Sequence, residues 1–312
     1  MSPNVAVLDI GSNTIKILVA GVDESGALTA RLSRTIDARI SAGIAQAEPR
    51  LSAEGMAAGL AAIQQLLAEA APFSPERVQL VATSAVRDAV NGAEFAERVA
   101  RETGCELRIL SGEEEAAGIG LGLTFDPAFA GLANFYVFDL GGGSLECLAF
   151  ADRQVQQALS LPLGCVRLTE KFVAHPEDPV RPVTWKRIMG HVRTVMAESD
   201  FRFDVPDATA IATGGTASTA RALCGLREGR PPDATSSLLT LRQLGEQLEH
   251  LAALPLAARR QVPGLPPERA DVYPAALATL IAVAETGGLV SFRHSFYNLR
   301  FGLAAQMLAG LR

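Results

Sequence analysis

The stretch that decides the fold is Asn134–Glu146, which reads Asn-Phe-Tyr-Val-Phe-Asp-Leu-Gly-Gly-Gly-Ser-Leu-Glu. The large apolar residues at 135–138 predict a buried β-strand that delivers Asp139 to a turn of three glycines. A turn without side chains exposes backbone N–H groups, which can surround an anion. An acid beside such a turn repels phosphate unless a divalent cation lies between them, so the stretch indicates metal-assisted phosphate chemistry.

The same arrangement occurs near the start of the chain, where Val5–Leu8 leads into Asp9-Ile-Gly-Ser-Asn-Thr. Both copies predict a β-hairpin with an aspartate at its mouth, and such repetition indicates two similar domains. Strand and helix patterns alternate along the chain, so we expect an α/β protein with ligands at the carboxyl ends of strands. The expected domains are 1–125 and 126–293, with a terminal helix at about 294–312 that packs back on the first domain.

Composition narrows the classes of function. The chain has 312 residues, of which 48% are hydrophobic and 20% charged, and its formal net charge is −6. No overall positive field attracts nucleic acid, so a polyanion must be bound by local cations or through a metal. The four cysteines form no Cys-x-x-Cys pair, which predicts reduced thiols and no zinc site. Without a signal-peptide pattern or a long apolar run, we expect a soluble cytoplasmic protein that binds neither nucleic acid nor membranes.

Three acids are candidate metal ligands. Asp9 and Asp139 precede the two small-residue turns, and Glu146 lies two residues after Ser144 on the returning strand. Mg²⁺ prefers a few carboxylates together with water and phosphate oxygens, so these acids predict a site for Mg²⁺, with Mn²⁺ as a possible substitute.

Glu115 and Arg87 are the candidate catalytic residues, and each has a plainer alternative. Glu115 ends a triple-acid run at a helix start, where acids stabilise the helix dipole. The functional interpretation is that it deprotonates a water that attacks a phosphoryl group. Arg87 follows a strand end and is either a surface partner of Asp88 or a clamp on phosphate oxygens.

A third small-residue turn, Thr213-Gly214-Gly215-Thr216, opens a predicted helix and is a natural anion site. Lys16 lies on the strand behind Asp9, and further cations are scattered through the chain. Singly each is typical of a solvated surface; together they are able to line a track for a long polyanion. The cations of this second set are Arg167, Lys171, Arg259, Arg260, Arg269 and Arg300.

Five segments together resemble the exopolyphosphatase and guanosine pentaphosphate phosphohydrolase (Ppx/GppA) family, in the family's order and over the full chain. They are Asp9-Ile-Gly-Ser-Asn-Thr, Thr83-Ser-Ala-Val-Arg-Asp-Ala-Val-Asn, Ser111-Gly-Glu-Glu-Glu-Ala, Asp139-Leu-Gly-Gly-Gly-Ser-Leu-Glu and Thr213-Gly-Gly-Thr-Ala. The resemblance implies two domains of the actin-like (ribonuclease H-like) fold that sugar kinases and chaperone ATPases share, with the active site in the cleft between them. It also implies hydrolysis of the terminal phosphate of inorganic polyphosphate.

The resemblance further implies roles for single residues. Glu115 takes the place of the catalytic base, Arg87 contacts phosphate, and Asp139 and Glu146 fall at the magnesium site. The phosphate-binding residues are expected to be Ser12, Asn13, Gly142, Gly143, Ser144, Gly214, Gly215, Thr216, Lys16 and Arg269, with Asp9 in the first loop.

The chain departs from the family pattern at Lys16, where relatives carry Arg or His, at Leu145, where Thr is usual, and at Phe301, where an acid is frequent. Many relatives also carry an additional helical module, so the chain resembles the short two-domain form, in which long-chain processivity is doubtful. A homodimer is plausible from the resemblance.

Other functions remain open on the sequence. Hydrolysis of guanosine pentaphosphate would use the same catalytic residues, although no guanine pocket is evident. A kinase or ATPase of the same fold and a non-catalytic polyphosphate-binding protein are the alternatives from other classes.

Overall fold

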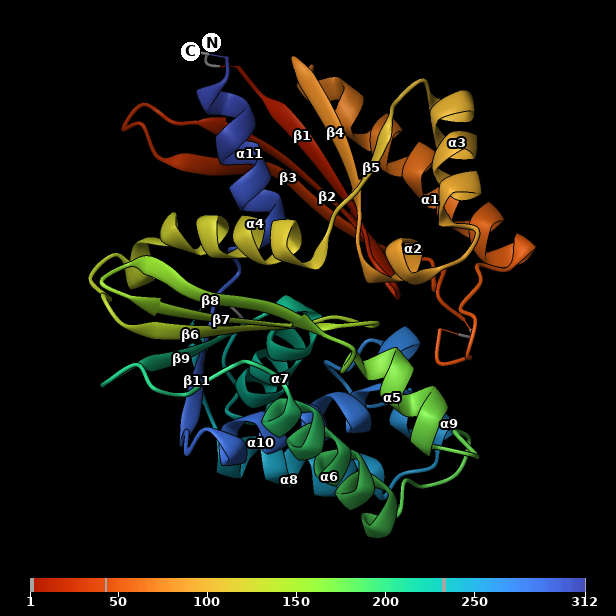
Figure 1. The fold of residues 1–312 in the computed structure, drawn as a ribbon, viewed down its shortest axis with the longest axis vertical. Coiled ribbons are helices and arrows are strands. Elements are labelled where there is room, and N and C mark those ends of the chain that lie inside the picture. Colours follow the sequence, from red (N-terminus) through yellow and green to blue (C-terminus); the bar gives the residue numbers. More distant parts are fainter. Residues whose placement is uncertain (1–2, 43, 232–233, 312) are drawn as a thin grey trace. The chain divides into compact units, whose positions relative to one another are not determined.

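The computed structural model describes residues 3–42, 44–231 and 234–311. The chain divides into two compact units, Met1–Gly131 together with Tyr297–Arg312, and Leu132–Phe296. Each unit contains one mixed β-sheet with its own helices (Figure 1).

The first unit is built on a sheet with the strand order β3-β2-β1-β4-β5. Strands β1 (Val5–Ile10), β2 (Thr14–Val22) and β3 (Leu28–Asp37) are antiparallel neighbours. Strands β4 (Arg77–Ala82) and β5 (Leu107–Ile109) continue parallel to β1. Strand β1 is central and buried at nearly every position, which explains its continuous apolar run.

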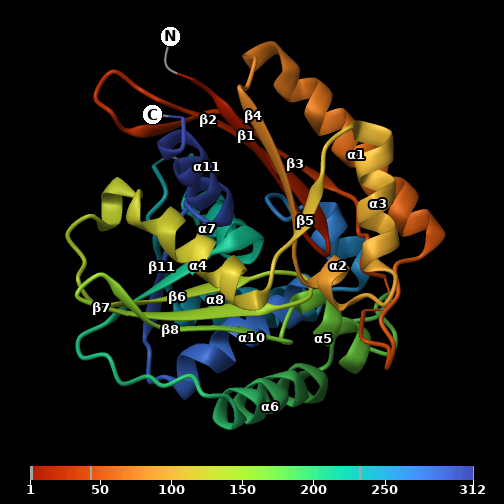
Figure 2. The same cartoon turned by 45° about the horizontal axis from the view of Figure 1, so that its top comes forward.

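Helices cover both faces of this sheet. Helix α1 (Ala53–Ala70) packs on β1, β2 and β3, whereas α11 (Leu299–Ala309) packs on β1, β2 and helix α4 (Gly112–Thr124). Figures 1 and 2 show these two groups on opposite faces, with α3 (Gly92–Thr103) on the side of α1. Shorter elements complete the unit: α2 (Ser84–Asp88), η1 (Ala71–Phe73) and η2 (Pro127–Phe129).

Local sequence signals set several helix ends. Ser52 caps α1 by accepting a hydrogen bond from the Gly55 backbone N–H at 2.9 Å. Gly104 ends α3 in the left-handed conformation, at φ 72°, which glycine adopts without strain. Serine at the start of a helix and glycine just beyond its end are residue types that favour these conformations, so the local sequence accounts for both helix ends.

The second unit repeats the strand order of the first. Its sheet runs β8-β7-β6-β9-β11-β10, in which β8, β7 and β6 are antiparallel neighbours and β9 and β11 run parallel to β6. The strands are β6 (Phe135–Leu140), β7 (Leu145–Ala151), β8 (Gln154–Leu161), β9 (Thr209–Thr213), β10 (Leu238–Thr240) and β11 (Ser291–His294). Two copies of one sheet topology confirm the predicted actin-like α/β fold class and the internal duplication.

The helical layer of the second unit centres on α10 (Tyr273–Thr286), which is buried on all sides and contacts α5, α6, α7 and α8. Helices α6 and α10 lie side by side in Figures 1 and 2. The remaining helices are α5 (Cys165–Phe172), α6 (Pro182–Glu198), α7 (Gly214–Arg227), α8 (Leu241–Ala252), α9 (Leu256–Arg259) and η3 (Pro267–Arg269).

The sequence pattern over 238–254 predicts a single helix, and this prediction is wrong at its start, because α8 begins only at Leu241. Residues 238–240 pair with β11 as strand β10, and Thr240 then caps α8 in a capping box with Gln243. Among the described residues, no helix is both long and apolar enough to cross a membrane.

Candidate active site

The mouths of the two duplicated hairpins differ in charge. In the first unit Asp9 on β1 lies directly opposite Lys16 on β2. In the second unit the equivalent position on β6 is Asp139, and the residue directly opposite it on β7 is Glu146. Directly opposed residues of an antiparallel pair point to the same face of the sheet. The first hairpin therefore brings a carboxylate and an ammonium group together, and the second brings two carboxylates together.

The acid pair of the second unit belongs to a row of oxygen donors across neighbouring strands. Ser160 on β8 is registered with Glu146, and Thr213 on β9 with Asp139. The Ser160 hydroxyl donates to Glu146 Oε1 at 2.8 Å, which orients that carboxylate. Thr213 Oγ1 is buried and has no hydrogen-bond partner among the described residues. A buried hydroxyl of this kind is unfavourable unless a ligand satisfies it.

This row suits a hard divalent cation. Asp139 and Glu146 supply two carboxylates, and no larger group of His, Cys, Asp and Glu side chains gathers at metal-binding distance within the described ranges. A site of two carboxylates leaves the other positions to water and phosphate oxygens, which is the coordination that Mg²⁺ prefers. The donor set therefore fits Mg²⁺, and also Mn²⁺.

The glycine turn after Asp139 is held by the start of helix α5. Gly141 N–H donates to the Ser144 carbonyl at 3.0 Å, which closes the turn. Two N–H groups of α5 donate to the loop carbonyls: that of Cys165 to Gly141 at 3.0 Å, and that of Val166 to Gly142 at 2.8 Å. These bonds occupy carbonyl oxygens of the loop and fix its path.

The approach of α5 to this loop requires a glycine. A Cβ atom at Gly164 would lie 2.2 Å from the carbonyl carbon of Gly143. The Arg167 Nε, one turn into α5, donates to the Gly143 carbonyl at 2.9 Å. Helix α5 is thus the support of the predicted phosphate loop.

The third turn lies beside the acid pair. Gly214 adopts φ +82°, and a Cβ atom there would lie 2.3 Å from Asp139 Oδ1. At Gly215 the corresponding atom would lie 1.7 Å from Nη1 of Arg269. The structure therefore brings the Asp139 carboxylate, the backbone of Gly214 and Gly215, and the Arg269 guanidinium into one neighbourhood, as the sequence assignments require.

In the first unit, the turn between β1 and β2 is tied to its surroundings through side chains. Ser12 Oγ lies 3.2 Å from Ser84 Oγ at the start of α2. Asn13 Oδ1 accepts a hydrogen bond from Arg39 Nε at 3.2 Å. The two predicted phosphate-loop side chains are both buried, so the turn would present backbone groups more than side chains to a ligand.

Arg87 and Glu115 form an ion pair. Arg87 Nη1 donates to Glu115 Oε2 at 2.9 Å and to the Leu110 carbonyl at 3.1 Å. The Glu115 side chain is 8% exposed and that of Arg87 is 22% exposed. Asp88, the surface partner in the plainer interpretation, is 3.7 Å away. The Arg87 guanidinium is therefore held beside Glu115, the candidate base. Its distance to Asp88 is longer than its distances to Glu115 and to the Leu110 carbonyl.

The three acids at the start of α4 have separate positions. Glu113 is exposed, and Glu114 forms a capping box with Ser111 and an ion pair with Arg108. The Ser111 backbone N–H and then Arg108 lower the pKa of Glu114. Glu114 caps the helix, so capping does not require Glu115. The Glu115 side chain is instead buried and paired with Arg87.

The predicted residues thus form two groups, one on each unit. The first unit carries Asp9, Ser12, Asn13, Lys16, Arg87 and Glu115; the second carries Asp139, Gly142, Gly143, Ser144, Glu146, Gly214, Gly215, Thr216 and Arg269. Sequence reasoning assigned no role to Ser160 or Gly164, whose contacts depend on strand register and helix placement. Thr213 was predicted only as part of the third turn, as the hydroxyl residue that precedes Gly214, and not as a member of the row beside Asp139.

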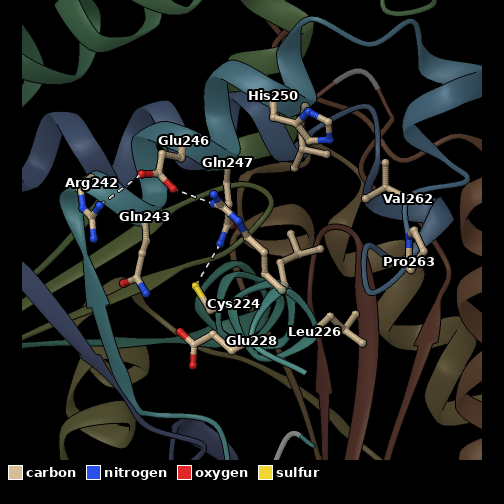
Figure 3. Close-up of a pocket in the computed structure, with 13 residues that line it drawn as sticks. Cys224, Leu226, Glu228, Arg242, Gln243, Glu246, Gln247, His250, Val262 and Pro263 are labelled. Carbon is tan, nitrogen blue, oxygen red and sulfur yellow. Dashed lines mark hydrogen bonds and ion pairs between the residues drawn. The ribbon is translucent and has the colours of Figure 1, made fainter. Parts of the chain in front are cut away.

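A cavity of about 760 Å³ lies elsewhere in the second unit, between the end of α7 and helix α8. Figure 3 shows Arg242 and Glu246 on one side of it and Val262 and Pro263 on the other. Cys224 Sγ accepts a hydrogen bond from Gln247 at 3.3 Å, and burial raises the pKa of this thiol. None of the predicted site residues lines this cavity, so it is not the predicted site.

The sequence matches a known protein family over almost its whole length. The model of the Ppx/GppA phosphatase family matches residues 18–310. The chain belongs to the Ppx/GppA phosphatase family. As a Ppx/GppA protein it is a hydrolase-type phosphatase, for which paired acids and glycine loops are suitable parts.

Relatives of known name and structure are similar over nearly the whole chain. A guanosine-5'-triphosphate,3'-diphosphate pyrophosphatase of Vibrio cholerae is 28% identical over 323 aligned positions, which cover 100% of this chain and 60% of that protein. The Ppx/GppA crystal structure from Aquifex aeolicus has a TM-score of 0.79 and 26% identity, with 100% of both chains covered. An exopolyphosphatase structure from Cytophaga hutchinsonii has a TM-score of 0.86 at 21% identity and 99% coverage of both chains, and it supports the fold. The chain spans only about three-fifths of the Vibrio protein.

Proposed function

We propose that this protein is an exopolyphosphatase, which hydrolyses the terminal phosphoanhydride bond of inorganic polyphosphate and releases orthophosphate. The observation that carries the proposal is the Asp139–Glu146 acid pair, which lies beside the glycine turns at 141–143 and 214–215. Acids alone would repel phosphate and glycine turns alone would bind any anion, whereas the combination suits a phosphate that arrives with a divalent cation.

The chain's own residues divide the reaction between them. Backbone N–H groups of the glycine turns bind and orient the phosphate oxygens, and Arg269 adds a charge beside the third turn. Glu115 accepts the proton of the attacking water, and Arg87 stabilises charge on the phosphoryl oxygens. Asp139 and Glu146 would hold Mg²⁺ or Mn²⁺, which would neutralise the negative charge of the substrate when bound.

The resting contact between Arg87 and Glu115 is compatible with both roles. Nη1 of Arg87 donates both to Glu115 and to the Leu110 carbonyl, so the carbonyl still holds this nitrogen if its bond to Glu115 breaks. A guanidinium has five N–H donors, so Arg87 can remain on this carbonyl while it binds phosphate. The Glu115 carboxylate would then have to move away from Arg87 to act as the base.

Hydrolysis of guanosine pentaphosphate is the second candidate. The Vibrio cholerae protein, whose similarity extends over the entire chain, carries the name of that activity. The same acids, loops and base would serve both substrates, because each reaction removes a terminal phosphate from an anhydride.

Phosphate release from long-chain polyphosphate and from guanosine pentaphosphate, measured side by side with Mg²⁺, tests the proposal. Polyphosphate should give the higher kcat/KM, and Glu115→Gln should lower the rate of release from both by about 100-fold or more. If only the pentaphosphate is hydrolysed, the second candidate replaces the first. Binding of polyphosphate without release under any divalent metal would identify a non-catalytic binding protein, and ATP turnover that Glu115→Gln leaves intact would indicate a kinase or ATPase.

A further inference from the structure

Two cations, one on helix α5 and one on helix α6, lie close to one aromatic ring, apart from the residues assigned to the candidate active site. Lys171 Nζ lies 3.2 Å from Nε2 of His191 on helix α6 and 5.5 Å from the centre of the Phe172 ring. Arg187, one turn before His191, places its guanidinium carbon 5.8 Å from the same ring. The His191 and Phe172 rings are 5.3 Å apart. We call Lys171, Phe172, Arg187 and His191 the Phe172 cluster.

Lys171 and Arg187 differ from two other exposed arginines, Arg193 and Arg227, in their carboxylate contacts. Arg193 on the same helix pairs with Glu285 at 2.6 Å, and Arg227 pairs with Glu246 at 2.6 Å. Within the described ranges, neither Lys171 nor Arg187 lies within 4.0 Å of a carboxylate oxygen. The cluster therefore gathers positive charge around an aromatic ring, in a chain whose net charge is −6.

Burial, and then the charge of Lys171, lower the pKa of His191, while the charge of Glu198 raises it. The neutral imidazole can accept a hydrogen bond from Lys171 through Nε2, which orients the ammonium group beside the Phe172 ring. An anion bound at this point would accept hydrogen bonds from Lys171 and Arg187. The geometry of the cluster thus favours an anionic ligand over an empty surface.

Helix α5 connects the cluster to the predicted phosphate loop. Its first turn donates to the loop carbonyls of Gly141 and Gly142, and Arg167 donates to that of Gly143. Lys171 follows Arg167 by four residues, so it lies on the same helix face about 6 Å further along the axis. A linear phosphate whose reacting end lies at the loop would have to extend along α5 to meet the cluster, so contact with the cluster would increase with the number of phosphates.

We propose that the Phe172 cluster is a distal binding site for the chain of an inorganic polyphosphate whose reacting end lies at the Gly141–Gly143 loop. This inference rests on the proposed exopolyphosphatase function and names the elements that would select long substrates. Single-stranded nucleic acid fits the cluster less well, because the bases of such ligands stack on open aromatic faces. The Phe172 ring is already packed by His191 and by both cations.

The test compares the double variant Lys171→Gln/Arg187→Gln with the wild type and with Arg193→Gln. The control removes another exposed arginine from the same helix, one that is paired with Glu285. For each protein, kcat/KM is measured for long-chain polyphosphate and for tripolyphosphate with Mg²⁺. Binding of long-chain polyphosphate is measured separately by calorimetry with a chelator present, because the cluster needs no metal.

The double variant should lose about tenfold or more in kcat/KM and affinity for the long chain, and its salt dependence should weaken by about one to two in log–log slope. Tripolyphosphate hydrolysis should change less than about twofold, as should every property of Arg193→Gln. An equal loss for both chain lengths, no loss for the long chain, or equal competition by single-stranded DNA would overturn the inference. If the wild type hydrolyses neither substrate, the proposed function fails, while the binding measurement still decides whether the cluster holds polyphosphate.

Discussion

Gly164 offers a sharp test of how the phosphate loop is held. Its own backbone, at φ −64° and ψ 149°, is acceptable to any residue, so Gly164→Ala introduces no torsional strain. The added Cβ would lie 2.2 Å from the carbonyl carbon of Gly143 and 2.3 Å from the Gly142 carbonyl oxygen. These neighbours are backbone atoms and cannot rotate aside, so either the loop or the start of α5 must move.

The effect of Gly164→Ala on stability and on KM depends on whether the loop or the start of α5 moves. If the contacts between α5 and the loop are retained under strain, overpacking should cost about 1–3 kcal/mol of unfolding free energy. For a domain of this size, the melting temperature should then fall by roughly 2–12 °C. If the loop moves instead, stability is retained and the cost appears as a rise in KM for phosphate substrates. Thermal melts and kcat/KM for polyphosphate together distinguish the two results.

Gly190→Ala is the matched control. Gly190 lies within helix α6, and a Cβ atom there would have no neighbour within 4 Å. Alanine should stabilise this helix by about 0.5–1 kcal/mol because glycine has the greater backbone freedom in the unfolded chain. A Gly164→Ala protein with the wild-type melting temperature and the wild-type kcat/KM would refute the conclusion that α5 fixes the loop.

Three further predictions concern single side chains. Glu115→Gln should lower kcat by about 100- to 10,000-fold while polyphosphate affinity stays close to that of the wild type. The control Glu114→Gln should retain turnover. Stopped assays of phosphate release and equilibrium binding of polyphosphate measure the two properties, and a Glu115→Gln protein that keeps its turnover but loses affinity would contradict the prediction. Glu146→Gln should raise the Mg²⁺ concentration needed for half-maximal activity by about tenfold or more, whereas Lys16→Gln should leave that requirement unchanged and alter KM; equal metal titrations for all three proteins would contradict this. Burial, and then Arg221, lower the pKa of His294 from 6.5 to about 4. Since the unfolded state binds more protons between these values, the wild type should lose roughly 3 kcal/mol as pH falls from 6.5 to 4. Denaturant melts of His294→Gln should show a smaller loss over this range, and a parallel pH dependence would disprove the assignment.

Features that depend on neighbouring residues in the chain were predictable. The two hairpins follow from apolar runs that end at Asp9 and Asp139, and the ends of α1 and α3 follow from Ser52 and Gly104. In each case the residue type decides the local backbone conformation, so no tertiary information is needed.

Features that depend on distant partners were not predictable. Helix α5 begins at Cys165 without a side-chain cap, because the carbonyls of the Gly141–Gly143 loop accept its first N–H groups. Strand β10 contains only three residues and owes its pairing to β11, more than fifty positions later in the chain. The contact of Ser160 with Glu146 likewise depends on the register of β7 and β8. No local pattern in the sequence carries this information.

The sequence predicts Asp9, Asp139 and Glu146 as metal ligands. The residues that face them in the two hairpins differ in charge, which indicates different roles for these acids. Residues directly opposite each other on antiparallel strands have Cβ atoms about 5 Å apart, where opposite charges stabilise the pair and like charges destabilise it. Asp9 faces Lys16, so the first hairpin carries a cation within its own strands. Asp139 faces Glu146, which is only 2% exposed, so solvent can do little to screen the two carboxylates from each other. The second hairpin therefore gains most from a divalent cation, and we expect Asp139 and Glu146 to dominate metal binding, with Lys16 beside Asp9 contributing a fixed positive charge for phosphate.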